Sequence, residues 1–495
     1  MVINFIRSNR FLILLVLCLF SVQFAIAQPP TAKKLVAKVD EYMKAAVKYD
    51  KFSGTILIAR NGLPVVTRSY GMANYELKVP NTPKTVFEIG SVSKQFTAMA
   101  IMQLQERGKL NVNDSICKHL EDCPAAWQPV TIHHLLTHTS GIMNFSSLPD
   151  WDERISVMSY THTGFVKVFR DLPLEFVPGE KYTYSNSGYY LLGLIIERTS
   201  GKSYREFLSE NIFVPLGMKS SNYNDHPALV PNRATGYYWK LDSFITAPNI
   251  NLALGFATSG IYTTVEDLLL WDKALYTEKL VSRKSLNEIF TPFTKGAPEG
   301  DQYGYGYGWN IGKKFDRQST SHGGRHNGFK AYIVRFPSER VTVLVQGNSD
   351  RSNATRIATN LAAIVFGAPY KLPVEQGSDM LLAAIAEKGI DAAVQQYREL
   401  KRTQPEKYNF NEPERTLNVI GYALLEQRKV KEAIEVFKLN VEMFPQSANV
   451  YDSLAEAYMV NGDKEVAIKN YEKSLELDSQ NTNAVKMLKE LRGNN

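Results

Sequence analysis

The segment S-V-S-K at residues 91–94 places a hydroxyl and an amine three residues apart, at the start of a predicted helix. Residues three apart on a helix lie on one face, so the Lys94 side chain can reach the Ser91 hydroxyl. A buried lysine can lose its charge and then accept the hydroxyl proton. Backbone N–H groups at the helix N-terminus can stabilise the oxyanion formed on attack. Taken alone, the pattern is weak and favours the alternative of a helix-capping serine beside a solvated lysine.

The second chemistry-bearing segment is Y-S-N at residues 184–186. A phenol close to a lysine ammonium has a lowered pKa and can act as a base, which is the role we predict for Tyr184. Asn186 is expected to present its amide on the same side of an extended turn. The alternative is a hydrophobic tyrosine cluster in a loop.

The third segment is H-G-G-R at residues 322–325, directly before two β-rich runs. Glycines at this position let a ligand lie along a strand edge, where a backbone N–H can face a carbonyl oxygen. By itself, His322 is also typical of a turn with a surface histidine.

In this order, the three segments resemble the motifs of the serine β-lactamase and penicillin-binding-protein superfamily, in its class C β-lactamase-like branch. Two other stretches, residues 131–141 and 188–193, resemble signatures of that branch. The similarity covers roughly residues 35–365. It implies an α+β fold, in which a β-lactamase/transpeptidase-like antiparallel sheet is flanked by helices and carries a helical subdomain.

The resemblance also implies roles for individual residues. Ser91 would be the acylated nucleophile, and Lys94 and Tyr184 would share the general-base and general-acid work. The substrate-binding residues would be Asn186, His322, Gly324 and Arg325, with the backbone N–H groups of Ser91 and Arg325 forming the oxyanion hole.

No metal or cofactor is implied. His134 and His138 have a helical spacing suited to zinc, but the glutamate of H-E-x-x-H does not accompany them, and the resemblance makes them structural.

One departure from the superfamily pattern bears on the substrate. His322 stands where the superfamily usually has the lysine of K-T-G, and histidine holds a β-lactam carboxylate less well at neutral pH. We therefore predict a serine hydrolase that acts on small esters or amides. The alternatives are a D-alanyl carboxypeptidase or a β-lactamase and, in a different class, a non-catalytic peptide-binding scaffold that uses the C-terminal repeats.

The elements that must position these residues can be read from the hydrophobic pattern. Asn61-Gly62 predicts a hairpin turn between two strands. Strands near both ends of the unit, with helices between them, predict one α+β domain whose sheet is completed by both ends. The expected helices are residues 33–50, 93–107 and 353–366, and the expected strands are 54–60, 63–70, an edge strand beginning in 303–309, 331–336 and 341–346.

The chain becomes helical after residue 376, with a repeat. Gly421, Ala433 and Phe437 recur as the similar Ala455, Ala467 and Tyr471, 34 positions later. This period is typical of tetratricopeptide repeats, whose concave face binds peptides or proteins. A generic helical bundle is the alternative. The predicted organisation is a signal peptide at 1–27, a hydrolase domain at 28–367, a linker at 368–376 and an all-α tetratricopeptide-like domain at 377–495.

The N-terminus predicts export. Arg7 and Arg10 precede an apolar run at 11–20, and A-I-A at 25–27 is typical of a signal-peptidase site. A retained membrane anchor is the alternative, and periplasmic or secreted localisation follows from cleavage. In an oxidising compartment Cys117 and Cys123 could pair, or remain two free thiols. The net charge of +7 comes without a basic run, so we expect a small-molecule or peptide substrate and no nucleic acid partner.

Overall fold

The structure is a computed structural model that describes residues 31–149, 151, 154–224, 229–248, 251, 254–294 and 302–493. The predicted signal peptide at 1–27 lies outside the described residues. Among the helices that are described, none combines the length and the apolar character that a membrane crossing requires.

A seven-stranded antiparallel sheet is the centre of the hydrolase part, in the order β10-β11-β12-β13-β14-β1-β2. The N-terminal hairpin pairs with β14, so both ends of the unit complete the sheet, as the sequence predicted. The predicted edge strand is β10. The strands are β1 (Gly54–Arg60), β2 (Leu63–Tyr70), β10 (Gln302–Tyr305), β11 (Asn310–Lys314), β12 (Arg317–His326), β13 (Phe329–Phe336) and β14 (Val341–Gly347).

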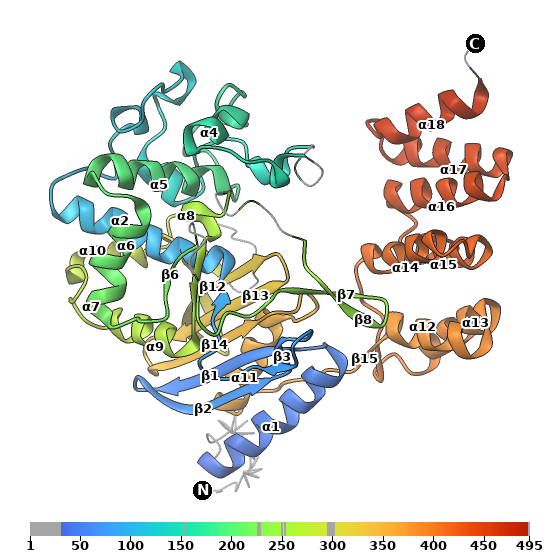
Figure 1. Ribbon diagram of the computed structural model, residues 1–495, viewed down its shortest axis with the longest axis horizontal. Coiled ribbons are helices and arrows are strands. Elements are labelled where there is room, and N and C mark those ends of the chain that lie inside the picture. Colours follow the sequence, from blue (N-terminus) through green and yellow to red (C-terminus); the bar gives the residue numbers. More distant parts are fainter. Residues whose placement is uncertain are drawn as a thin grey trace, which may run out of the picture.

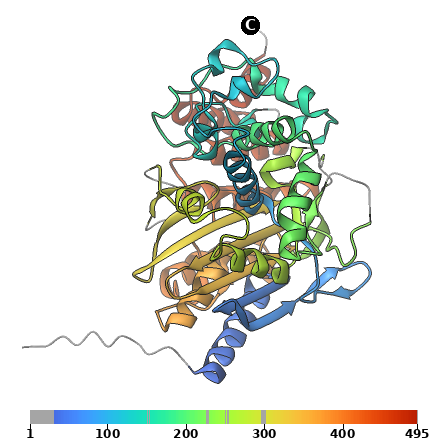
Figure 2. The ribbon, with the colours of Figure 1, turned by 90° about the vertical axis from the view of Figure 1, so that its left-hand side faces the viewer.

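Helices cover both faces of this sheet because alternate strand residues are apolar on each side. On one face, Ile56 and Val343 pack against α1 (Ala32–Tyr49) and α11 (Ala354–Phe366). On the other face, Leu57 and Leu344 belong to a larger core with α2 (Lys94–Glu106) and α5 (Asn186–Ser200). Figures 1 and 2 both place α1 and α5 on opposite sides of the sheet.

The helical subdomain lies between β5 and β10 in the chain and carries the loops over the site. Its helices are α3 (Ile132–Leu136), α4 (His162–Arg170), α6 (Tyr204–Leu208), α7 (Val214–Leu216), α8 (Phe256–Ser259), α9 (Val265–Ala274) and α10 (Arg283–Ile289), with α2 and α5. Three small sheets accompany it. The first pairs β3 (Met72–Asn74) with β4 (Val79–Pro80), and the second has the order β5 (Phe87–Glu88), β9 (Ile261–Thr263) and β6 (Asn222–Tyr223). The third pairs β7 (Tyr237–Lys240) with β8 (Ser243–Thr246).

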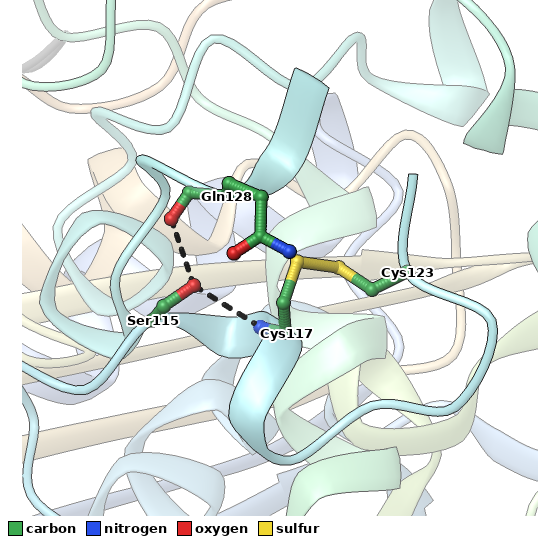
Figure 3. Close-up of a disulfide and its surroundings, with 4 residues drawn as sticks. All are labelled: Ser115, Cys117, Cys123 and Gln128. Atoms are coloured by element: carbon green, nitrogen blue, oxygen red, sulfur yellow. Dashed lines mark hydrogen bonds between the residues drawn. A yellow bond between two sulfur atoms is a disulfide. The ribbon is translucent and has the colours of Figure 1, made fainter. Parts of the chain in front are cut away.

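Cys117 and Cys123 form a disulfide (Figure 3), which decides between the two alternatives that the sequence left open. Ser115 caps the turn that carries Cys117. Its hydroxyl accepts a hydrogen bond from the Cys117 N–H at 3.3 Å and donates one to the Gln128 carbonyl at 2.8 Å. The bridge and this cap together fix the loop that follows α2.

The chain beyond the hydrolase part is helical, as predicted, and forms a stack beside it (Figure 1). A Cβ on Gly421 would lie 2.5 Å from the Phe437 ring, so the glycine lets α14 and α15 approach closely. The tetratricopeptide assignment and the domain boundaries stay predictions. The elements are β15 (Glu375–Gln376), α12 (Gly377–Lys388), α13 (Ile390–Thr403), β16 (Tyr408–Asn409), α14 (Glu414–Glu426), α15 (Val430–Met443), α16 (Ala448–Asn461), α17 (Lys464–Leu477) and α18 (Thr482–Arg492).

Two ion pairs join the described residues of the helical stack to the hydrolase part. Arg351, after β14, pairs with Asp379 of α12 at 2.8 Å. Lys240, at the tip of the β7–β8 hairpin, pairs with Glu426 of α14 at 3.0 Å, and Figure 1 shows this hairpin reaching toward the stack. The neighbouring Leu241 packs against the apolar core of the stack.

Candidate active site

Ser91 lies in a tight 3₁₀ turn, Gly90–Ser93, between β5 and α2. Lys94 is the first residue of α2 and is completely buried, whereas Ser91 is half-exposed. The Lys94 Nζ lies 3.2 Å from the Ser91 Oγ, so the three-residue spacing brings the amine to the hydroxyl as predicted.

Two carbonyl oxygens hold the Lys94 amine from segments distant in the chain. Its Nζ donates to the Asn186 Oδ1 at 2.9 Å and to the Thr258 backbone carbonyl at 3.0 Å. Neither partner is charged, and burial lowers the Lys94 pKa well below its ordinary value. A neutral amine has two N–H bonds for these carbonyls and one lone pair left, which faces Ser91. The site is therefore built for a lysine that accepts a proton.

Tyr184 lies against Lys94, with the Nζ 4.9 Å from the centre of the phenol ring. Its hydroxyl is buried and near Ser91, but it makes no hydrogen bond of normal geometry among the described residues. Burial raises the Tyr184 pKa well above its ordinary value, and the neighbouring Ser91 hydroxyl lowers it only in part. The predicted lowering is wrong because burial of the phenol outweighs the interaction that favours its ionised form. Tyr184 is a protonated phenol at neutral pH.

His322 on β12 is buried and uncharged. Its Nε2 hydrogen-bonds the Tyr305 hydroxyl at 2.9 Å, and its Nδ1 faces the Gly323 carbonyl at 2.6 Å. Burial lowers the His322 pKa to about 3, so the imidazole carries no charge at neutral pH. The sequence placed Tyr305 in the edge strand but did not identify it as a partner of the site, because the two residues meet only across the sheet.

β12 passes directly against the 3₁₀ turn Gly90–Ser93, which we call the nucleophile turn. The two backbones are so close that only glycines fit at the contact. A Cβ on Gly324 would lie 1.8 Å from the Ile89 carbonyl oxygen, and one on Gly90 would lie 2.5 Å from the Arg325 nitrogen. The Arg325 backbone is thereby held next to Ser91. β11 pairs with β12 only as far as Ser321, so the described strands leave this edge of residues 322–326 open.

A cavity of about 660 Å³ opens at this edge. Ser91, Tyr184 and His322 line it, together with the glycines of β12. The three predicted motifs therefore meet at one cavity although they are up to 231 residues apart in the chain. Asn186 lies behind this group, where its amide bridges Lys94 and the Ser146 hydroxyl, to which it donates at 3.0 Å.

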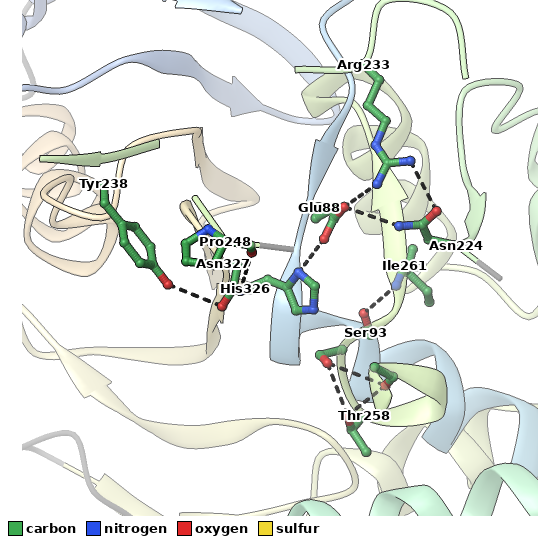
Figure 4. A network of polar contacts seen from close by, with 12 residues as sticks. Glu88, Ser93, Asn224, Arg233, Tyr238, Pro248, Thr258, Ile261, His326 and Asn327 are labelled. Carbon is green, nitrogen blue, oxygen red and sulfur yellow. Dashed lines mark hydrogen bonds and ion pairs between the residues drawn. The ribbon is translucent and has the colours of Figure 1, made fainter. Parts of the chain in front are cut away.

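An ion-pair network, which the sequence did not indicate, ties β12 to the nucleophile turn (Figure 4). Glu88 of β5 is buried and pairs with His326, at the end of β12, and with Arg233. Burial alone would raise the Glu88 pKa, but the charges of His326 and Arg233 bring it below its ordinary value. Glu88 lies just before the nucleophile turn and His326 directly follows Arg325. Their ion pair therefore joins the two segments that bring Ser91 and Arg325 together.

The two histidines with helical spacing make backbone hydrogen bonds. His134 Nδ1 accepts from the Thr131 N–H at 3.2 Å, at the start of α3. His138 Nδ1 accepts from the Ser185 N–H at 3.1 Å, and its ring lies 4.2 Å from that of Tyr184. His138 therefore supports the tyrosine segment.

Comparison with known proteins identifies relatives of the whole hydrolase part. The family model described as Beta-lactamase matches residues 35–367. Penicillin-binding protein 4* of Bacillus subtilis is 32% identical over 361 residues, which are 70% of this chain and 78% of that protein.

Solved structures agree with this result. The octameric penicillin-binding protein homologue from Pyrococcus abyssi matches with a TM-score of 0.60 and 31% identity, over 67% of this chain and 78% of that one. A D-stereospecific amidohydrolase from Streptomyces sp. matches with a TM-score of 0.59 over 67% of this chain and 99% of that one. At 22% identity this second likeness shows a common fold.

Proposed function

The chain belongs to the β-lactamase family, and is a serine hydrolase of the β-lactamase and penicillin-binding-protein superfamily; from this premise we propose that it cleaves small esters or amides through an acyl-enzyme on Ser91. The observation that carries the proposal is the buried Lys94, whose two N–H bonds point at the Asn186 and Thr258 oxygens and whose lone pair is left for the Ser91 hydroxyl.

The proposed acylation proceeds as follows. Ser91 Oγ attacks the substrate carbonyl carbon while its proton passes to Lys94 Nζ. The oxyanion accepts hydrogen bonds from the backbone N–H groups of Ser91 and Arg325. The proton on Lys94 then reaches the leaving group through the Tyr184 hydroxyl. In the second half, a water molecule gives a proton to Lys94 while its oxygen bonds to the acyl carbon. The bond from that carbon to Ser91 Oγ then breaks, the acid leaves, and Lys94 returns its proton to the Oγ.

The choice of substrate rests on His322. An uncharged imidazole at this position gives no cation for the carboxylate of a β-lactam or of a D-alanyl peptide, which favours esters and amides without a charge beside the reacting carbonyl. The D-alanyl carboxypeptidase and β-lactamase alternatives are kept because a relative is named a penicillin-binding protein.

We further propose that the protein is exported. The signal-peptide pattern supports this, and so does the disulfide, which is a feature of proteins in oxidising compartments. The helical stack is proposed to be a tetratricopeptide domain, beginning after a linker at 368–376.

The test is active-site labelling. Wild type and the Ser91→Ala variant are incubated with a fluorescent fluorophosphonate and, separately, a fluorescent penicillin, and adducts are mapped by mass spectrometry. We expect a fluorophosphonate adduct on Ser91, absent in Ser91→Ala. Ser93→Ala is the matched control, because the Ser93 hydroxyl is buried and accepts from the Ile261 N–H at 3.1 Å.

Each labelling outcome separates two functions. A rapid penicillin adduct on Ser91 would move the substrate to cell-wall peptides or β-lactams. No adduct with either probe, in protein that circular dichroism shows to be folded, would overturn the hydrolase and leave the peptide-binding scaffold.

A further inference from the structure

The cavity at Ser91 continues past the open edge of β12 to a group of cations. Beyond the glycines it is lined by Arg325, by Lys330 of β13, and by Asp350 in the segment that leads into α11. Alternate residues of a strand face opposite sides, so Gly324 faces the nucleophile turn while Arg325 faces away from it. A ligand that fills the cavity therefore runs from the nucleophile, past the strand edge, to the face covered by α11.

Arg325 and Lys330 oppose each other directly across the β12–β13 ladder. Like charges in this position repel and destabilise a sheet. Lys330 is half-buried and makes no ion pair among the described residues. Within these residues, therefore, no carboxylate at contact distance neutralises its charge. Burial lowers the Lys330 pKa, and Arg325 lowers it further.

Asp350 is the carboxylate that lines the cavity beside these two cations. Asp350 is the one carboxylate facing this group that influences the Lys330 pKa, and it already accepts the Trp239 N–H at 2.8 Å. The neighbouring Arg351 is neutralised by Asp379. Arg325 and Lys330 thus face one carboxylate, which leaves an excess of positive charge at the end of the cavity.

We propose that Arg325 and Lys330, the basic patch, bind a carboxylate or phosphate group at the non-reacting end of the substrate. The proposal rests on the proposed function for its reacting end. It adds that the ester or amide carries its negative charge at a distance from the carbonyl, because the patch lies across the strand edge from Ser91.

The test uses two matched series of 4-nitrophenyl esters. One series has half-esters of dicarboxylic acids of increasing chain length, and the other has the neutral alkanoates of equal length. We expect kcat/KM to favour the charged ester by about tenfold at one of the longer lengths, and this preference to fall as salt rises. No charge preference at any length, with neutral esters hydrolysed, would overturn the basic patch and leave the proposed function standing.

Variants assign the preference to the patch. Lys330→Gln should lose most of it while neutral esters react as in wild type, and Lys330→Arg should keep it. Lys431→Gln, which removes an exposed charge from α15, is the control. A preference that survives in Lys330→Gln would contradict the assignment.

Equilibrium binding makes the test independent of turnover. Ser91→Ala protein is titrated with suberate and, separately, with inorganic phosphate by calorimetry. Binding that Lys330→Gln weakens about tenfold supports the patch, and the better of the two anions identifies the group. If neither anion binds, the basic patch is refuted. This result does not depend on whether the protein hydrolyses esters.

Discussion

At the scale of single residues, the chemistry depends on Lys94 being an amine. The same side chain in water would be an ammonium and could not accept the Ser91 proton. Its two hydrogen-bond acceptors are neutral carbonyls, and complete burial penalises the charge, so the pKa lies well below the ordinary lysine value. The pair Ser91 and Lys94 is therefore ready to react without rearrangement.

Lys94→Arg is expected to lower kcat/KM by about 10²–10⁴-fold, because a guanidinium stays protonated and cannot act as a base. In wild type, activity rises with pH as Lys94 loses its proton, and its lowered pKa brings this rise below the range of an ordinary lysine. The measurement is kcat/KM against pH for a neutral 4-nitrophenyl ester. The exposed Lys109→Arg serves as control, and a fully active Lys94→Arg would contradict the role.

His322 provides a second test at this scale, through stability. Its pKa is lowered from 6.5 to about 3 in the folded protein, so the unfolded chain binds a proton that the folded one does not between these values. Stability is therefore lost as pH falls below 6.5, by up to about 1.4 kcal/mol per pH unit for this residue.

Urea unfolding of wild type and His322→Gln from pH 4 to 7 checks this. The free energy of unfolding should fall less steeply with decreasing pH in the variant. The difference between the two curves reports His322 together with its electrostatic coupling to His138, whose pKa His322 lowers. Parallel curves would mean that the imidazole titrates normally in the fold.

At the scale of elements, the site depends on β12 lying against the nucleophile turn. The glycines permit this contact, and the Glu88–His326 ion pair holds it (Figure 4). A strand displaced by about one ångström would take the Arg325 N–H out of reach of the oxyanion, since hydrogen bonds weaken steeply with distance and angle.

Gly324→Ala is expected to cost about 1–3 kcal/mol of stability and most of the activity, because its Cβ would lie 1.8 Å from a backbone oxygen that cannot move alone. The control is Gly201→Ala, at a φ of 71° with nothing within 4 Å, which strains the backbone by about 1–2 kcal/mol away from the site. Thermal unfolding and kcat/KM separate the two. Equal kcat/KM losses in both variants would contradict the close-contact argument.

At the scale of the whole molecule, the sheet closes before the helical stack begins. β14 and α11 precede residue 367, and Tyr370 still packs on Tyr42 of α1, with ring centres 6.4 Å apart. Polar pairs such as Arg351–Asp379 and Lys240–Glu426 join the stack to the hydrolase part. The exposed Lys240–Glu426 pair contributes little to stability. The two core clusters of the hydrolase part contain no residue of the stack, so they do not depend on it for their packing.

A chain that ends after Lys371 is therefore expected to fold and to react with fluorophosphonate at Ser91 as fast as the full chain. It should also keep the preference for charged esters, because Arg325 and Lys330 both belong to the hydrolase part. Labelling kinetics and the paired ester series measure both. An insoluble or unlabelled truncated protein would show that the two parts are not independent.

The sequence by itself determined what is local in the chain. The Ser91–Lys94 contact spans three residues of one turn, and the Asn61-Gly62 turn sets its own hairpin, so short-range geometry decides both. The alternating apolar pattern of the strands likewise predicted the sheet and both of its ends. The motif set was sufficient to assign the family.

The tertiary structure decided the protonation states in the site and which distant residues line it. Lys94 is held by acceptors 92 and 164 residues away, and His322 loses its charge only because the fold encloses it. Desolvation depends on everything packed around a group, which no local pattern contains. The same reason explains why the roles of Glu88 and Lys330 were not predicted. In the sequence, an isolated charged residue is typical of a solvent-exposed side chain, and only the folded structure shows which charged groups lie close together.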